Sequence, residues 1–318
     1  MPARGDAMTA SEGMRDVTGT VALDDPRAVA DATAAILART YGAAFDAAVL
    51  HDAFAYAAQL FGGRLPGYLA CDMPYHDLRH SHDAALAAAR LVDGRVRTAG
   101  AAALPADAGT AAVVLALLHD TGFLRTRAES AQRGPQFAAV HESRSVAVAD
   151  AYLRRSALAH RANLSPMIMA TRVAERTAPL YAGREDDAIA VGCILGTADL
   201  LCQVADPRYL ERCYHHLYAE LALGAAEGGA AAFRDARDLV ARTPAFCTSV
   251  VEPRLAGDLR GAAATLGAHF GGHDPYAASV RTNVDRCRRI VDDDRWELLG
   301  PPPPTTTTGL HPAYRAGA

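Results

Sequence analysis

The chain contains no lysine, because all 32 of its basic residues are arginine. Mechanisms that need a lysine amine, such as Schiff-base catalysis and phosphate binding by a P-loop or kinase lysine, are therefore excluded. The overall charge is not positive either, with a formal net charge of -4 and a pI near 6.3. We therefore expect neither a nucleic-acid polymer nor a membrane as partner, and a small-molecule substrate is favoured.

The six cysteines include no Cys-x-x-Cys pair, which is the spacing typical of zinc ribbons. We expect reduced, mostly buried thiols and no disulfide scaffold. No apolar run approaches the roughly 20 residues that cross a membrane, and the charged N-terminus does not fit a secretory signal. These features predict a cytoplasmic protein.

Half of the 318 residues are hydrophobic, which is enough for a large core. Alanine, leucine, arginine and glutamate dominate, apolar residues recur at helical spacing, and the sequence shows no alternating runs joined by hairpin turns. The sequence therefore predicts an all-α fold. We expect helices over residues 27–40, 43–61, 76–93, 107–121, 137–157, 163–175, 186–204, 206–226, 230–242, 249–270 and 274–292.

One domain is expected over residues 25–299, within which the helices from 230–299 could form a C-terminal subdomain. Residues 1–24 lack stable periodicity and predict a flexible N-terminal arm. At the other end, four prolines are followed by four threonines, starting at Pro301. Such a segment can form extended polyproline II but builds no core, so residues 300–318 are predicted to be a disordered tail.

A long apolar run ends in His119 and Asp120, an imidazole followed by a carboxylate. Burial of an unpaired carboxylate is costly, so Asp120 needs a cation or a dense set of hydrogen-bond donors. Asp199 raises the same question, because it too lies in an apolar helical run. It could also cap a neighbouring helix or pair with Arg172 or Arg208. Together these acids and the histidine favour a divalent-metal site.

His76 and His80 are four residues apart and therefore share one face of a helix. In such a pair one imidazole can bind metal while the other moves protons, although two surface histidines in a charged first turn would give the same pattern. His141, followed by Glu142, is a third element. It is a ligand of a second metal, or a hydrogen-bond partner of metal-bound water with Glu142 behind it, or part of an ordinary helix N-terminus where the charge of Glu142 interacts favourably with the helix dipole.

Taken in chain order, these residues resemble a known family. His80, the pair His119-Asp120 and Asp199 resemble the H…HD…D signature of the HD-domain superfamily of metal-dependent phosphohydrolases, whose fold is all-α. The resemblance extends over roughly residues 68–225. Within that superfamily, residues 75–83 (YHDLRHSHD) are similar to the YHNxxHAxDV motif of cyclic nucleotide phosphodiesterases. The segments Met169-Ala170-Thr171 and Thr197-Ala198-Asp199-Leu200 look like the LAT and CADL segments of the same enzymes.

The resemblance implies a role for each matching residue. His80, His119, Asp120 and Asp199 would bind a first metal ion, and Asp120 would also bridge to a second. His76 falls at the position where those phosphodiesterases have the general acid.

The sequence also departs from the phosphodiesterase pattern. Asp77 stands in place of the usual asparagine, and Thr121-Gly122-Phe123 follows the HD pair in place of a longer, histidine-containing stretch. No residue of this chain was matched to the glutamine that clamps the purine in those enzymes. These departures bear on whether the substrate is a cyclic nucleotide.

We therefore expect a phosphohydrolase that depends on one or two divalent ions, drawn from Mn²⁺, Mg²⁺, Fe²⁺ and Zn²⁺. The substrate would be a small phosphoester, such as a cyclic or other nucleotide. In the expected mechanism Asp120 is shared between two ions, a metal-activated hydroxide attacks phosphorus, and His76 protonates the departing alkoxide. Two alternatives stay open: an HD-fold di-iron oxygenase and a non-catalytic sensor that binds a nucleotide.

Overall fold

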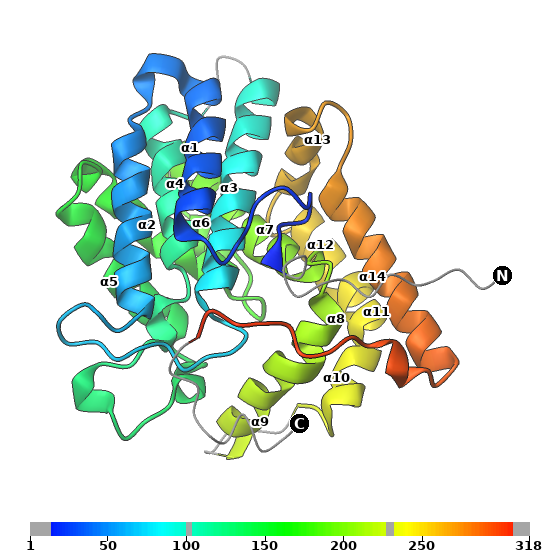
Figure 1. Ribbon diagram of the computed structural model, residues 1–318. Coiled ribbons are helices and arrows are strands. Elements are labelled where there is room, and N and C mark those ends of the chain that lie inside the picture. The colour runs from blue at the N-terminus through cyan, green and yellow to red at the C-terminus, as the bar shows by residue number, and fades with distance from the viewer. Residues whose placement is uncertain (1–13, 100–103, 227–231, 308–318) are drawn as a thin grey trace.

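A computed structural model of the protein describes residues 14–99, 104–226 and 232–307. Within these ranges the fold is all-α, as predicted, and its β pairing is limited to two isolated bridges, Arg15 with Ala22 and Tyr68 with Thr126. The α-helices (Figure 1) are α1 (Pro26–Tyr41), α2 (Ala47–Phe61), α3 (Leu78–Ala99), α4 (Ala106–Leu118), α5 (His141–Arg154), α6 (Ala178–Tyr181), α7 (Asp186–Val204), α8 (Tyr209–Arg212), α9 (Tyr218–Ala226), α10 (Ala236–Ala241), α11 (Thr243–Phe246), α12 (Glu252–Ala256), α13 (Leu266–His269) and α14 (Pro275–Asp292).

Shorter helical turns connect these elements. Two π-helical stretches, Cys213–Leu217 and Cys247–Val251, join α8 to α9 and α11 to α12. The 3-10 helices are Gly42–Ala44, Thr121–Phe123, Arg127–Glu129, Gly134–Phe137, Ala159–Thr171, Ala262–Thr265 and Trp296–Leu298.

Helix α3 lies at the centre of the fold, where it contacts α1, α4, α7 and α13 (Figure 1). Every residue from Arg79 to Gly94 is buried. The many alanines of this stretch let neighbouring helices approach on several sides. The approach is closest at Gly94, where an added Cβ would lie 2.0 Å from the carbonyl oxygen of Thr265. Because the first turn of α3 carries His80, this central packing also fixes a candidate metal ligand.

Helices α4 and α7 pack on α3 and on each other. All residues of α4 from Ala108 to Leu118 are buried, as expected for a helix that is apolar all round. Among the described residues, α7 is the one helix long and apolar enough to cross a membrane, yet 83% of its most apolar window is buried inside the protein. Helix α7 is therefore a core helix of a globular fold.

The starts of two helices follow their local sequence signals. Asp25 caps α1 by accepting hydrogen bonds from the backbone N–H groups of Arg27 and Ala28, and Asp274 caps α14 by accepting one from Ala277. A proline follows each cap, where its missing N–H is not needed. Both helices begin within one residue of the predicted starts.

The single helix predicted over residues 249–270 is wrong. The region contains the end of a π-helical stretch, α12, a 3-10 turn and α13. Helix α12 ends at Ala256 with Gly257 at its C-cap, and Gly261, just before the 3-10 turn, has a left-handed φ of 70°, which glycine adopts without strain. The helix predicted over residues 163–175 is also different, because Ala159–Thr171 is 3-10 helical and contains Pro166.

The first described residues are anchored to the core, unlike the flexible arm predicted over residues 1–24. The buried carboxylate of Asp16 pairs with the guanidinium of Arg90 at 2.6 Å, and Leu23 is fully buried. The prediction is therefore wrong for residues 14–24, while residues 1–13 lie outside the described part of the chain.

The predicted disorder of the C-terminal tail is likewise wrong for residues 300–307. This segment lies against the helices, and the side chain of Thr307 donates a hydrogen bond to the carbonyl oxygen of Met73 at 2.6 Å. Residues 308–318 of the predicted tail lie outside the described residues.

His216, in the stretch between α8 and α9, provides a test of the packing. Burial and the nearby Arg212 guanidinium lower the pKa of His216 to about 3. An unfolded chain protonates this ring near pH 6.5, so the stability contributed by the neutral ring is complete above pH 6.5 and is lost as the pH falls toward 3. Between pH 7 and pH 5, wild type should therefore lose roughly 2 kcal/mol more unfolding free energy than His216→Gln.

Urea unfolding at the two pH values measures this difference. The exposed His273 provides the matched control, and His273→Gln should follow wild type at both pH values. Parallel pH dependence of wild type and His216→Gln would contradict the prediction.

Candidate metal centre

Four side chains from three helices meet in the core. His80 comes from α3, His119 and Asp120 from the end of α4, and Asp199 from α7. The Nε2 atoms of the two histidines are 3.2 Å apart. Oδ2 of Asp120 lies 3.2 Å from each of them, and Oδ1 of Asp199 lies 3.3 Å from each. Atoms bound to one ion at about 2.1 Å, at angles of about 90–110°, are about 3.0–3.4 Å apart, so the two Nε2 atoms have the spacing of metal ligands with each other and with the oxygen of either acid.

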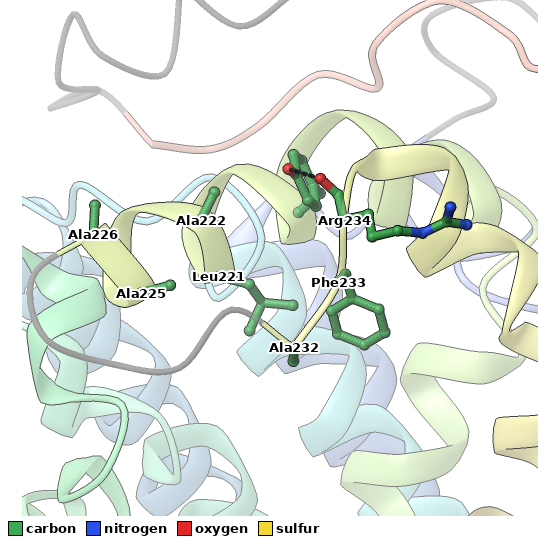
Figure 2. A pocket seen from close by; sticks show the side chains of 8 residues that line it. Leu221, Ala222, Ala225, Ala226, Ala232, Phe233 and Arg234 are labelled. Carbon is green, nitrogen blue, oxygen red and sulfur yellow. Dashed lines mark hydrogen bonds between the residues drawn. The ribbon is translucent and has the colours of Figure 1, made fainter.

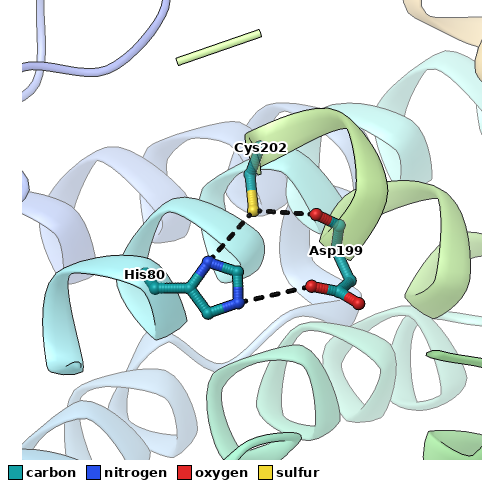
Figure 3. A group of neighbouring side chains, drawn as sticks. All are labelled: His80, Asp199 and Cys202. Carbon is teal, nitrogen blue, oxygen red and sulfur yellow. Dashed lines mark hydrogen bonds and ion pairs between the residues drawn. The ribbon is translucent and has the colours of Figure 1, made fainter. Parts of the chain in front are cut away.

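Hydrogen bonds on the far side of each ring orient both imidazoles. Nδ1 of His119 lies 2.7 Å from the carbonyl oxygen of Ala116, which can only accept, so Nδ1 is protonated and Nε2 is the nitrogen available to a proton or a metal ion. In His80 the partner of Nδ1 is the Cys202 sulfur at 3.7 Å (Figure 3). That thiol donates to the Asp199 carbonyl at 3.2 Å, so its sulfur accepts from Nδ1. Both Nε2 atoms therefore face the carboxylates, as metal ligands require.

The electrostatics of the cluster call for a cation. Burial opposes ionisation of Asp120, but the nearby His119 outweighs it and holds the pKa of this carboxyl well below its usual range. The pKa of Asp199 is lowered by the same histidine against the same opposition. Conversely, both carboxylates raise the pKa of His119 well above its usual value in spite of burial. Oδ2 of Asp120 is buried with the two imidazole nitrogens at 3.2 Å, so it fits an oxygen that coordinates a metal ion.

Asp199 is held by a short chain of hydrogen bonds. The Gln203 amide nitrogen donates to Oδ1 of Asp199 at 2.7 Å, and the Tyr75 hydroxyl donates to the Gln203 carbonyl at 3.1 Å. The two arginines considered as partners, Arg172 and Arg208, pair with other groups instead. The pairing alternative for Asp199 is therefore wrong, and its carboxylate faces the two histidines.

The turn after Asp120 brings the start of α5 onto the centre. An added Cβ at Gly122 would lie 1.8 Å from the carbonyl oxygen of His141, so only glycine permits this approach. The Gly122 amide also donates to the Ser145 hydroxyl at 2.8 Å. Nδ1 of His141 lies 2.8 Å from the Ala138 carbonyl oxygen, and Nε2 lies 3.6 Å from Oδ1 of Asp120. Asp120 thus has one oxygen toward His141 and the other toward the main cluster.

His76 lies beside the cluster and is partnered by an acid. Its Nδ1 is 2.5 Å from Oε2 of Glu220. The other oxygen of this carboxylate, Oε1, accepts hydrogen bonds from the backbone N–H groups of His76 and Tyr75. Burial lowers the pKa of His76, but the Glu220 carboxylate outweighs it and raises the pKa to about 8. The side chain keeps 20% exposure, so a protonated imidazole remains accessible beside the cluster.

One phenyl ring separates His76 from His141. The Phe123 ring stacks on His76 at a centroid distance of 4.8 Å and on His141 at 4.1 Å. Phe123 is 3% exposed, so the three rings form a packed row along one side of the cluster. This row fixes the separation between the two histidines.

The structure places every sequence-predicted site residue in this one region: His76, His80, His119, Asp120, His141 and Asp199. Sequence reasoning missed Glu220, although it is the one acid in the apolar helix α9, the same signal that singled out Asp199. It also missed Cys202 and Gln203. They follow Asp199 by about one helical turn and so share its face, but neither residue type is by itself a signal.

A hollow elsewhere offers no comparable chemistry. It has a volume of about 370 Å³ and lies between α9 and residues 232–234 (Figure 2). Leu221, Phe233 and several alanines line it, and its lining residues include no carboxylate, imidazole or thiol.

No protein-family model matches this chain, and no curated protein matches it significantly. The assignment of a function therefore rests on the geometry of the centre.

The cluster predicts tight divalent-metal binding that depends on each ligand. In chelator-treated protein, His119→Ala and Asp199→Ala should each weaken Mn²⁺ binding by about 100-fold or more, because each removes one donor atom from a buried set. Titration calorimetry measures the affinity. His160 supplies a matched control, since it pairs with Asp107 at 2.8 Å on the surface, and His160→Ala should bind Mn²⁺ like wild type. Equal affinities for wild type and both ligand variants would refute a metal site here.

Proposed function

We propose that this protein is a divalent-metal-dependent phosphohydrolase, similar in its centre to HD-domain enzymes and, among these, to cyclic nucleotide phosphodiesterases. The observation that carries the proposal is the convergence of two Nε2 atoms and two carboxylate oxygens at 3.2–3.3 Å. Imidazole nitrogen and carboxylate oxygen in one site suit Mn²⁺, Fe²⁺, Zn²⁺ or Mg²⁺. The proposed cofactor is one or two such ions, and Asp120 together with His141 would hold the second.

A divalent ion bound at this centre would supply Lewis-acid stabilisation of phosphoryl charge and activate water for attack on phosphorus. The residues divide the remaining work. His80, His119 and Asp199 would hold the ion, and Asp120 has one carboxylate oxygen toward these histidines and the other toward His141. His76 can donate a proton from Nε2 to the departing alkoxide, because Glu220 holds Nδ1 and keeps the ring protonated near pH 7.

The proposed substrate is a small phosphoester, with a cyclic or other nucleotide as the candidate that the resemblance favours. The proposed location is the cytoplasm. All six cysteines lie within the described residues, are buried and carry free thiols, as expected of a protein kept in a reducing compartment.

The alternatives fit the site less well. A di-iron oxygenase needs additional histidine ligands, and the one histidine between His141 and Asp199 is His160, whose side chain is 59% exposed and pairs with Asp107. A sensor that only binds a nucleotide has no need of four converging metal ligands. Metal analysis combined with assays for aryl phosphodiester hydrolysis and oxygen consumption separates the three functions. Hydrolysis supports the proposal, whereas oxygen consumption with tightly bound iron, or binding without turnover, contradicts it.

The proton-donor role of His76 predicts a dependence on the leaving group. His76→Ala should keep wild-type Mn²⁺ affinity but lower kcat roughly 100- to 10,000-fold for a phosphodiester with an alkyl leaving group. A nitrophenyl leaving group needs little protonation, so its kcat should fall far less. Glu220→Gln should change the two rates in the same direction but by smaller factors, because it removes only the charge that orients His76.

Steady-state kinetics with both substrates test this difference. His51→Ala is the control, since His51 pairs with Asp31 at 3.0 Å on the surface, and its rates should match wild type. Equal losses of kcat for the two leaving groups in His76→Ala would show that His76 is not the proton donor.

A further inference from the structure

Residues 300–307 form an extended strap that crosses the molecule. In Figure 1 it is the red segment that runs from the end of the α14 region across α8 toward the start of α3. Near its beginning, the Gly300 amide donates to Oε1 of Glu211 at 3.1 Å. The Arg208 guanidinium donates to the Pro301 carbonyl oxygen at 2.7 Å. These bonds tie the proline half of the strap to α8.

The threonine half of the strap ends on one buried carboxylate. Oδ2 of Asp77 accepts hydrogen bonds from the Thr305 hydroxyl at 2.8 Å and from the Thr306 amide and hydroxyl at 2.9 Å each. Asp77 is fully buried. Without these three donors Oδ2 would be buried and unpaired, and the Arg212 guanidinium, 3.6 Å from Oδ1, would be left to compensate the charge, so the carboxylate would be drawn out of its present position.

The other oxygen of Asp77 is hydrogen-bonded to the first turn of α3, the helix that carries His80. Oδ1 accepts the backbone N–H of His80 at 3.2 Å, and the Asp77 carbonyl accepts that of Ser81 at 3.3 Å. Asp77 directly follows His76 in the chain and precedes His80 by three residues. Its carboxylate therefore joins the strap to the turn that carries both histidines.

We propose that the strap is a positioning segment of the metal centre. Thr305 and Thr306 hold Asp77, and Asp77 holds the first turn of α3, so that His80 keeps its place relative to its fellow ligands. The four prolines favour extended polyproline II before docking, which lowers the entropy lost when the strap binds. The effect on metal affinity rests on the proposed metal centre, whereas the effect on the turn itself does not.

The test uses Thr305→Val/Thr306→Val, which removes both hydroxyl donors to Asp77, and with Thr306 the acceptor of the Arg79 backbone N–H at 3.3 Å, while keeping side-chain shape and backbone. Mn²⁺ affinity should fall about tenfold, in the range of changes to groups that orient metal ligands. Hydrogen–deuterium exchange should rise in peptides covering residues 76–84 and stay unchanged in α7. Thr305→Ser/Thr306→Ser restores the hydroxyls and should recover both values. Thr248→Val, which alters an exposed threonine, should leave both unchanged.

Wild-type exchange at residues 76–84 in the double valine variant overturns the proposal, whatever the metal affinity. A wild-type protein that binds no Mn²⁺ refutes the proposed metal centre, while the exchange measurement still decides whether the strap holds the turn. If the double variant does not fold, the single variant Thr305→Val, which removes one donor, should show the same local rise in exchange. Unchanged exchange at residues 76–84 in Thr305→Val also overturns the proposal.

Discussion

Two carboxylates and two imidazoles buried around one point are the constraint on which the rest of the structure depends. Asp120 and Asp199 remain ionised in a setting from which water is largely excluded, and their charge must be balanced. A proton on His119 balances part of it, and a divalent ion would take the place of that proton. Removing any one of these groups leaves the others as uncompensated buried charges or as buried polar atoms without a partner.

The fold meets this constraint by placing each ligand on a rigid, buried element. Helices α3, α4 and α7 are mutually packed, so the ligands they carry cannot drift independently. Close approach is as important as rigidity, because Gly122 lets the start of α5 bring His141 against Asp120. Some contacts that orient the imidazoles join distant segments of the chain: Cys202 contacts the His80 ring and Glu220 contacts the ring of His76.

The sequence predicted the helical core and the side chains that meet within it for the same physical reason. Polar residues such as Asp199 stand out within apolar runs, and helical periodicity is a local property of the chain. Contacts between distant segments leave no such pattern. Thr305 meets Asp77 across 228 positions and His76 meets Glu220 across 144, so the strap and the acid partner emerged only with the fold. Residues 249–270 were misjudged because their composition is helical, whereas the chain turns at Gly261.

Anomalous diffraction from crystals grown with Mn²⁺ tests the central claim most directly. The account predicts a Mn²⁺ peak about 2.0–2.3 Å from Nε2 of His80 and of His119 and from a carboxylate oxygen of Asp120 and of Asp199. A crystal with Mn²⁺ bound only at other positions, and with these four side chains in contact only with one another or with water, would contradict it.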